Sequence, residues 1–343
     1  MHELPVILAM GQFDGIHRGH QAVLRAAAAE AEALGGVALC LTFSPHVQQV
    51  LNPERAPLLL ATDRQNERAV RACGLAGLLA FPFSREWAGR GALDFLRVLP
   101  DFLKAAVSAE QTDFPIHGNI FPIIGKNFPH DGKNFPHSGK PERGSERVRL
   151  AGVAVGANFT FGCGREGTAL GLAGLAQAAG LEKAIVVPPV QWKGADISSS
   201  RIRAAVEAGD MEAAEAMLGR PFALEGTIVH GRGEGRQNGL PTANVRPTLA
   251  IRPRPGVYAA RLSLENAAGA PGGAFVPDGT DEAQRVRFGD VVEVHVAEGQ
   301  GDWYGREADV VFRKRMRGFM AFASEAEAAV QIRKDIEEMR AWW

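Results

Sequence analysis

The chain has 343 residues, of which 46% are hydrophobic and 22% charged, and this composition is ordinary for a globular protein of about two domains. Its formal net charge of -1 excludes a general electrostatic attraction to nucleic acid or membrane surfaces, so anions must be recognised by local side chains and backbone N–H groups. The three cysteines lack disulfide or zinc spacing, and no apolar run approaches the roughly 20 residues of a membrane span, so we expect a cytoplasmic protein.

The first half of the chain alternates apolar, β-rich runs with Ala-rich helical stretches. This alternation is typical of a parallel sheet covered by helices. The strands are expected at 4–10, 36–43, 76–81 and 148–155, and the helices between them at 20–32, 63–73 and 92–103.

A glycine-rich decapeptide, Gly11 to His20, follows the first expected strand and leads into the first helix. The unpaired N–H groups and positive dipole end of a helix start favour a bound anion. His17 and His20 are three residues apart, so both rings can donate to the same phosphate. A bare pair of histidines would usually be solvated surface, but the whole decapeptide indicates a nucleotide site, with the candidate contacts Gly11, Phe13, Asp14, Gly15 and Gly19.

Two further loops follow expected strands of the same sheet. His46 stands in Ser44-Pro45-His46 after the second strand, at the carboxyl end where open α/β sheets bind ligands. Asn158 and Phe159 follow the strand that ends at 155. On their own, a loop histidine is more often plain surface and a phenylalanine at this spacing is more often core.

The segment 111–146 breaks the pattern of strands and helices. It repeats Gly-Lys-Asn-Phe-Pro-His at 125–130 and 132–137 and keeps no helical or strand period. Such a long structureless connection indicates an insertion or a disordered loop. Its repeated His130 and His137 lack the accompanying ligands of a metal site, so no metal is expected there.

A serine run, Ser198-Ser199-Ser200, stands directly before a helical stretch expected at 201–207, which is followed by another at 211–217. The hydroxyls would cap the helix and add donors to its N-terminus. Arg203 supplies a planar, permanently charged group suited to phosphate. Alone, the run could equally be an ordinary helix cap.

Past 218 the sequence changes to short strands and turns, and a second domain is expected there. A strand at 224–230 precedes a glycine-rich loop that includes Gly231, Gly235 and Arg236 and can wrap phosphates. Thr242 and Asn244 offer oxygen ligands suited to Mg²⁺. Glu293 lies in an apolar strand at 291–295, and the chain ends in a helix expected at 324–342.

The motifs together resemble those of the prokaryotic bifunctional riboflavin kinase/FMN adenylyltransferase (FAD synthetase) family. The resemblance is carried by the decapeptide, by Thr42 to His46, by Gly156 to Gly162, by Ile197 to Arg203 and by Pro241-Thr242-Ala243-Asn244. It implies a Rossmann-like nucleotidylyltransferase domain at 1–217, followed by a small antiparallel β-barrel kinase domain with a C-terminal helix at 218–343.

The resemblance also implies the reactions and the roles of residues. The protein would phosphorylate riboflavin and then adenylylate FMN, with ATP as co-substrate, Mg²⁺ as cofactor and riboflavin, FMN and FAD as ligands. His17, His20 and Arg203 would act in adenylylation, and Glu293 would be the general base of the kinase. Flavin contacts would come from His46, Asn158, Phe159 and Arg317.

This chain departs from the family pattern at three places. Thr160 stands where many relatives carry Arg, and Arg165 is a candidate substitute. The family sequence Gly-Val-Ala-Asn-Ile-Gly-x-Arg-Pro-Thr is replaced by 272–280, which contains Phe275. After Arg317, Phe319 and Ala321 take the places of an acidic residue and a lysine. Two alternatives therefore stay open: an adenylyltransferase whose barrel only binds flavin, and a flavin-binding or regulatory module without catalysis.

Overall fold

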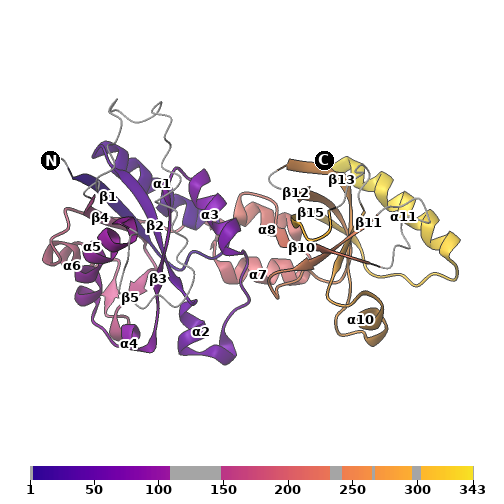
Figure 1. Ribbon diagram of the computed structural model, residues 1–343, viewed down its shortest axis with the longest axis horizontal. Helices are drawn as coiled ribbons and strands as arrows, with labels where there is room; N and C mark the ends of the chain where they lie inside the picture. The colour runs from indigo at the N-terminus through magenta and orange to yellow at the C-terminus, as the bar shows by residue number, and fades with distance from the viewer. Residues whose placement is uncertain (1–2, 109–147, 232–241, 265–266, 296–302, 343) are drawn as a thin grey trace. The chain divides into compact units, whose positions relative to one another are not determined.

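The structure is a computed structural model that describes residues 3–108, 148–231, 242–264, 267–295 and 303–342 (Figure 1). The segment expected as an insert, 111–146, lies outside the described residues. The chain forms two compact units: the first contains Met1–Pro57 and Asn66–Asp196, and the second contains Leu58–Gln65 and Ile197–Trp343.

The first unit is built on a five-stranded parallel sheet with the strand order β3-β2-β1-β4-β7. Its strands are rich in Val, Ile, Leu and Ala and are mostly buried, as expected of parallel strands that are covered on both faces. The strands are β1 (Leu4–Met10), β2 (Val37–Ser44), β3 (Gly77–Pro82), β4 (Val148–Gly156) and β7 (Lys183–Val187).

Helices cover both faces of this sheet (Figure 1). Alternate residues of β1 point to opposite faces: Val6, Leu8 and Met10 join the core beneath α5 and α6, whereas Ile7 and Ala9 join the core beneath α1 and α3. The four helices are α1 (Arg18–Ala33), α3 (Asp63–Ala72, whose first three residues count with the second unit), α5 (Ala92–Ser108) and α6 (Leu172–Ala178).

Short elements complete the first unit around the carboxyl ends of the strands and the connections. These are α2 (Val47–Leu51), α4 (Arg85–Ala88), the two-stranded pair β5 (Thr160–Phe161) and β6 (Gly167–Thr168), and the pair β8 (Gln191–Trp192) and β9 (Ala195–Asp196).

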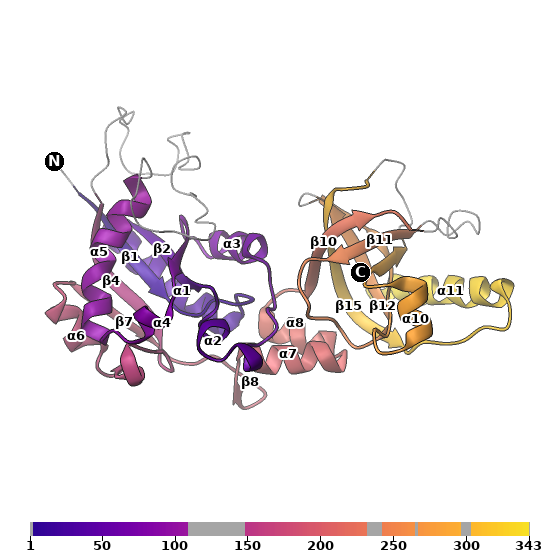
Figure 2. The same ribbon diagram turned by 60° about the horizontal axis from the view of Figure 1, so that its bottom comes forward.

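The second unit contains a closed barrel of six strands, in the order β10-β11-β14-β13-β12-β15 (Figure 2). All its strand pairs are antiparallel. The strands are β10 (Ala223–Val229), β11 (Thr242–Pro247), β12 (Gly256–Leu264), β13 (Ala267–Val276), β14 (Val292–His295) and β15 (Glu307–Arg317).

The barrel interior is filled by side chains. Tyr258 and Phe312 are fully buried with their ring centroids 5.3 Å apart, and Phe222 lies 6.2 Å from Phe312. Alternate strand residues such as Val245, Val294 and Ala274 also point inward and are buried. Burial raises the pKa of Tyr258 to about 12, although Arg315 and Arg254 oppose the shift. Inward and outward residues alternate along each strand of a barrel, so the polar residues between the buried strand positions lie on the outside.

The described part of the second unit contains the helices α7 (Ser199–Ala208), α8 (Met211–Leu218), α10 (Glu282–Phe288) and α11 (Glu325–Met339). Helix α8 is held to β15 by two ion pairs, Glu215 with Arg313 and Glu212 with Lys314. Helix α11 lies beside the barrel in both views and contacts β12 and β13 (Figures 1 and 2).

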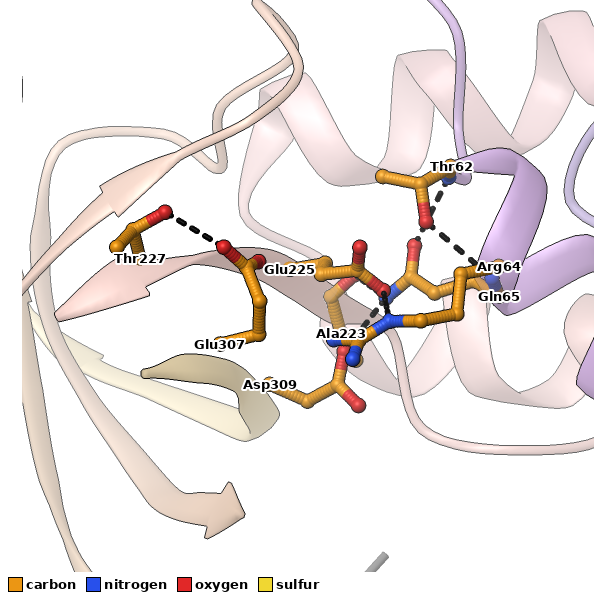
Figure 3. Close-up of polar contacts among 8 residues, drawn as sticks. All are labelled: Thr62, Arg64, Gln65, Ala223, Glu225, Thr227, Glu307 and Asp309. Carbon is orange, nitrogen blue, oxygen red and sulfur yellow. Dashed lines mark hydrogen bonds and ion pairs between the residues drawn. The ribbon is translucent and has the colours of Figure 1, made fainter. Parts of the chain in front are cut away.

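The segment Leu58–Gln65 of the second unit is fixed to the outside of β10 and β15 (Figure 3). Arg64 Nε donates to Glu225 Oε2 at 2.9 Å, and the Glu225 side chain is only 7% exposed. Gln65 Nε2 donates to the carbonyl of Ala223 at 3.2 Å and to Asp309 Oδ1 at 3.0 Å. Thr62 Oγ1 accepts from the backbone N–H of Gln65. This hydrogen bond orders the turn that carries the Arg64 and Gln65 side chains.

The expected fold class is confirmed, with a parallel α/β unit followed by a closed antiparallel barrel and a C-terminal helix. Each expected strand and helix within the described residues is present, and the ends differ by a few residues. Helix α7 begins at Ser199, two residues before the expected start, because Ser198 takes the cap position. The domain boundary at 217/218 stays a prediction, because the two compact units group residues by their contacts within the chain and do not define domains.

Candidate active sites

The first candidate site is the turn between β1 and α1. Gly15 has φ 79° and Ile16 has φ 38°, so the backbone passes through the left-handed region at two successive residues. Glycine adopts this conformation readily, whereas isoleucine does so at a cost that often marks functional sites. Asn66 Oδ1 accepts from the backbone N–H of Gly15 at 3.0 Å and holds the turn.

His17 and His20 lie face to face in this turn, with ring centroids 3.6 Å apart and planes inclined by 18°. His17 is the N-cap of α1, and its Nδ1 accepts from the backbone N–H of His20 at 3.2 Å. The proton of neutral His17 is therefore on Nε2. The edge of the Phe13 ring packs against His20 at 5.1 Å.

The Nδ1 of His20 is buried and has no hydrogen-bond partner among the described residues, although the residue as a whole is only half-buried. Burial, with a smaller contribution from neighbouring His17, lowers the pKa of His20 well below its ordinary value of 6.5. The ring is thus neutral at pH 7. The turn places a neutral imidazole beside the N-terminus of α1. Both can donate hydrogen bonds, so the turn suits a bound phosphate group.

His46 follows β2 and caps α2, with its Nδ1 accepting from the backbone N–H of Gln48 at 3.1 Å. Gln12 of the decapeptide connects the two turns: its side chain donates to the carbonyl of Phe43 at 3.4 Å and accepts from the N–H of Val47 at 3.3 Å. Since β1 and β2 are parallel neighbours, the decapeptide and His46 lie at the same edge of the sheet.

Asn158 and Phe159 follow β4, which pairs with β1 on its other side, so they belong to the same carboxyl edge. Asn158 is exposed, and Phe159 stacks on Phe161 with centroids 5.6 Å apart. Arg165 is exposed in a short 3-10 turn with φ 62°. That Arg165 supplies the positive charge of the Arg that many relatives carry at the place of Thr160 stays a prediction.

The serine motif lies at the start of α7, in the second unit. Ser198 Oγ accepts from the N–H of Arg201 at 3.3 Å, which confirms the expected cap. Ser199 and Ser200 are the first helical residues. Arg203 Nε donates to the carbonyl of Leu58 at 2.6 Å, so the guanidinium is anchored on the segment Leu58–Gln65.

The second candidate site lies on the outer face of the barrel, where β11 and β14 pair. Asn244 is directly opposite Glu293, and Thr242 is opposite His295. Thr242 Oγ1 donates to Glu293 Oε1 at 2.8 Å. The structure therefore brings the three residues expected at the kinase site, Thr242, Asn244 and Glu293, onto one face.

Gly231 shows how closely the start of the glycine loop approaches this face. A Cβ at Gly231 would come within 1.9 Å of the amide nitrogen of Asn244, so any other residue there would displace the Asn244 side chain. Gly235 and Arg236, the other two expected phosphate contacts of the loop, lie outside the described residues.

Arg317, expected to contact flavin, is held by α11. Its Nε and Nη2 donate to Asp335 at 2.6–3.2 Å, and the Asp335 side chain is 6% exposed. Gln331 Nε2 also donates to Asp335 at 2.8 Å. The guanidinium thus ties the end of β15 to α11, and its contact with flavin stays a prediction.

Comparison with known proteins resolves the family. The FAD synthetase model matches residues 2–114 and the riboflavin kinase model matches residues 218–343. A bifunctional riboflavin kinase/FMN adenylyltransferase of Escherichia coli K12 is 30% identical over 96% of this chain and 90% of its own length. The chain belongs to that family.

Other members of the family are similar to this chain over most of their length. The enzyme of the same description from Pseudomonas fluorescens is 30% identical over 98% of this chain and 92% of its own. That of Bacillus subtilis is 26% identical over 97% of this chain and 90% of its own. The similarity to these relatives thus spans both units of the chain.

One solved structure covers all of this chain and 96% of its own, with a TM-score of 0.74 and 25% identity. It is named as a macrolide-efflux protein from Streptococcus pneumoniae, which says nothing of this chain's activity. Within the described residues, this chain has no helix that is long and apolar enough to cross a membrane.

Mg²⁺ is the cofactor that members of this family typically require, and the oxygen chemistry of the barrel site fits it. Thr242 Oγ1 keeps its lone pairs free for a metal because it donates its proton to Glu293. Mg²⁺ commonly takes only one or two protein oxygens, with phosphates and water as its other ligands. A cluster of three or more His, Cys, Asp or Glu residues suited to a metal is absent from the described ranges.

The contacts of three supporting residues, Gln12, Asn66 and Asp335, were not predicted from the sequence. Gln12 stands inside the decapeptide, but its two contacts involve β2 and α2, some 30 positions away. Asn66 and Asp335 act on Gly15 and Arg317 from separate helices. Nothing in their local sequence signals those contacts.

Proposed function

We propose that this enzyme phosphorylates riboflavin to FMN on the outer face of its barrel and adenylylates FMN to FAD with the β1–α1 turn. Membership of the bifunctional family, with both family models matched, supports both reactions. The observation that carries the proposal is that Thr242, Asn244 and Glu293 converge on the barrel while the two histidines stack in the turn. The adenylyltransferase with an inactive barrel is therefore not favoured.

In adenylylation, a phosphate oxygen of FMN attacks the α-phosphorus of ATP, and pyrophosphate leaves. No covalent bond to the enzyme is required, so catalysis consists of positioning and stabilisation of charge. His17 would donate from Nε2, because its Nδ1 already accepts from His20. Ser199 and Arg203 would bind ATP phosphates from the start of α7, as the matching family motif implies.

The remaining contacts of the adenylylation site are proposed by position. Gly11, Phe13, Asp14, Gly15 and Gly19 would shape the nucleotide pocket, and Ser198 and Ser200 would add to the α7 N-terminus. His46, Asn158 and Phe159 would contact flavin, since they lie at the same sheet edge as the decapeptide.

In phosphorylation, Glu293 would accept the proton of the riboflavin 5′-hydroxyl as that oxygen attacks the γ-phosphorus of ATP, with ADP as leaving group. The hydrogen bond from Thr242 orients the carboxylate. Thr242 and Asn244 would hold Mg²⁺, which when bound neutralises phosphate charge. Gly231, Gly235 and Arg236 would bind the ATP phosphates, and Arg317 would support the flavin.

We also propose a cytoplasmic location, which is where ATP and free flavins would be available to such an enzyme. The ligands proposed are ATP, riboflavin, FMN and FAD, without nucleic acid or a membrane as partner.

The decisive experiment incubates the purified full chain with ATP, Mg²⁺ and either riboflavin or FMN, and separates the flavins by chromatography. We expect FMN and FAD from riboflavin, and FAD from FMN. Conversion of FMN alone would leave an adenylyltransferase with an inactive barrel. No conversion of either flavin would identify a binding module and overturn the proposal.

A further inference from the structure

Two of the places where this chain departs from the family pattern meet in the structure. Phe275 lies on β13 and Phe319 lies just after β15, and their ring centroids are 6.1 Å apart with planes inclined by 43°. The family pattern has Asn at the place of Phe275 and an acidic residue at the place of Phe319. In this chain, a pair of aromatic rings thus replaces two polar side chains of the family pattern.

The pair begins one strand away from the proposed kinase base. Phe275 is directly opposite Glu293 across β13 and β14, and Glu293 is directly opposite Asn244 across β14 and β11. Residues paired in this way share a face, with Cβ atoms about 5 Å apart. Their strand neighbours Ala274, Val294 and Ala243 are buried in the barrel, which places Phe275, Glu293 and Asn244 on the outer face.

The surface around the pair is partly open to solvent. Phe319 is 51% exposed, and its neighbour Met320 is 42% exposed. Large apolar side chains next to polar catalytic groups are typical of pockets that bind small organic ligands. A ligand for this place should have an apolar, planar part beside a hydroxyl that reaches Glu293.

Riboflavin has that form, because its ribityl chain separates the reacting 5′-hydroxyl from the planar isoalloxazine ring. We propose that Phe275 and Phe319 hold the isoalloxazine ring of riboflavin during phosphorylation, and so determine flavin specificity in this chain. The inference rests on the proposed kinase function of the barrel and names the part of the substrate that these side chains bind. Stacking on aromatic rings replaces the polar contacts that the family pattern makes available there.

The test uses the variants Phe275→Leu and Phe319→Leu, which keep an apolar side chain but remove the ring. Lumiflavin, which has the isoalloxazine ring without the ribityl chain, serves as a competitive inhibitor of FMN formation. One lost aromatic contact of about 1 kcal/mol corresponds to roughly a fivefold loss of affinity. We expect each variant to raise the KM for riboflavin and the inhibition constant of lumiflavin about fivefold, with kcat within about twofold of the parent.

Val330→Ala is the matched control, because Val330 is an exposed apolar residue of α11, 67% exposed. The KM for ATP in FMN formation, measured on each variant, reports whether the barrel is intact, because neither ring is proposed to contact ATP. A KM and an inhibition constant that stay unchanged in both leucine variants, while the parent makes FMN, would overturn the ring contact and leave the kinase function standing.

Lumiflavin binding is also followed by fluorescence titration, which needs no turnover. A parent chain that makes no FMN, but whose lumiflavin binding weakens in Phe319→Leu, would refute the kinase function and retain the ring contact. Absence of both FMN formation and a response to Phe319→Leu would refute both.

Discussion

His20 is half-buried, and its Nδ1 is a buried atom that has no hydrogen-bond partner among the described residues. Most buried polar atoms in folded proteins have a partner, so such an atom needs an explanation. We propose that a ligand supplies this partner: the imidazole of His20, stacked on His17, would meet the phosphate or base of a nucleotide bound at the turn.

Replacement of both rings in the variant His17→Ala, His20→Ala should abolish FAD formation. Loss of donors aimed at developing phosphate charge typically costs a factor of about 100 to 1,000 for each donor. Formation of FMN from riboflavin should stay within about twofold of the parent, because the kinase residues stand on the barrel. Chromatography of both reactions measures this, and an equal loss of both activities would count against two separate sites.

Acid should destabilise the protein through His20. Its pKa is lowered in the folded state, so below the unfolded value of about 6.5 the unfolded chain binds the proton and the folded chain does not. This contribution is fully present above that pH and falls by up to about 1.4 kcal/mol per pH unit as the solution is acidified.

The measurement is urea denaturation of the full chain at pH 7.5 and pH 5.5, compared between the parent and His20→Gln. The parent should lose about 1.4 kcal/mol more than the variant over this range. Identical losses would show that His20 takes up its proton in the folded chain as easily as in the unfolded one.

At the level of elements, the segment Leu58–Gln65 contacts both α7 and the barrel. Its carbonyl at Leu58 accepts from Arg203, and its Arg64 and Gln65 side chains grip β10 and β15 (Figure 3). Burial acts to lower the pKa of Arg64, but the hydrogen bond and charge of Glu225, with Asp309 and Glu307, raise it overall. The charge of Glu225 is thus the main electrostatic anchor of the segment.

The variant Glu225→Gln should loosen this anchor. Arg64 is 43% exposed and can regain water, so we expect a modest cost of about 1 kcal/mol, discounted for screening by solvent. Amide hydrogens of 60–65 should then exchange about fivefold faster in hydrogen-exchange measurements. Glu86→Gln, which breaks the exposed pair with Arg90, is the control and should leave those amides unchanged. Unchanged exchange in Glu225→Gln would show that other contacts hold the segment.

Elements were predicted better than contacts. The period of apolar residues is local information, and it located β1 to the residue and the other strands that it predicted to within a few residues, but β7 and β13 were not predicted. The start of α7 was misjudged because three successive serines offer three possible caps, and only the backbone geometry selects Ser198. The link from Arg64 to Glu225 joins positions 161 apart, and no local pattern carries it.

For the whole molecule, the two proposed sites use separate sets of residues and share FMN as a diffusible compound. The variant Glu293→Gln should make FAD from FMN but not from riboflavin, and His17→Ala, His20→Ala should stop at FMN. A mixture of the two variants with riboflavin, ATP and Mg²⁺ should therefore form FAD, which neither forms alone. A time course by chromatography should show free FMN before FAD.

Failure of the mixture, with each variant keeping its own single activity, would show that FMN passes between sites without release. The parent chain at the same total concentration is the control for the rate.

The candidate sites show the same division between local and distant information. The sequence predicts their principal residues, because each motif is contiguous in the chain. It does not predict that Phe275 meets Phe319, that Gln12 joins two turns, or that Asp335 holds Arg317, since each depends on which strands and helices become neighbours.

The filled interior of the barrel has a consequence for how such an enzyme can change. Tyr258, Phe312 and the inward valines complete the core without help from the outer face. Mutations at outward positions such as 275 leave that packing intact, so they alter what the surface binds at little risk to folding. The barrel therefore provides a stable scaffold on which flavin preference can evolve residue by residue.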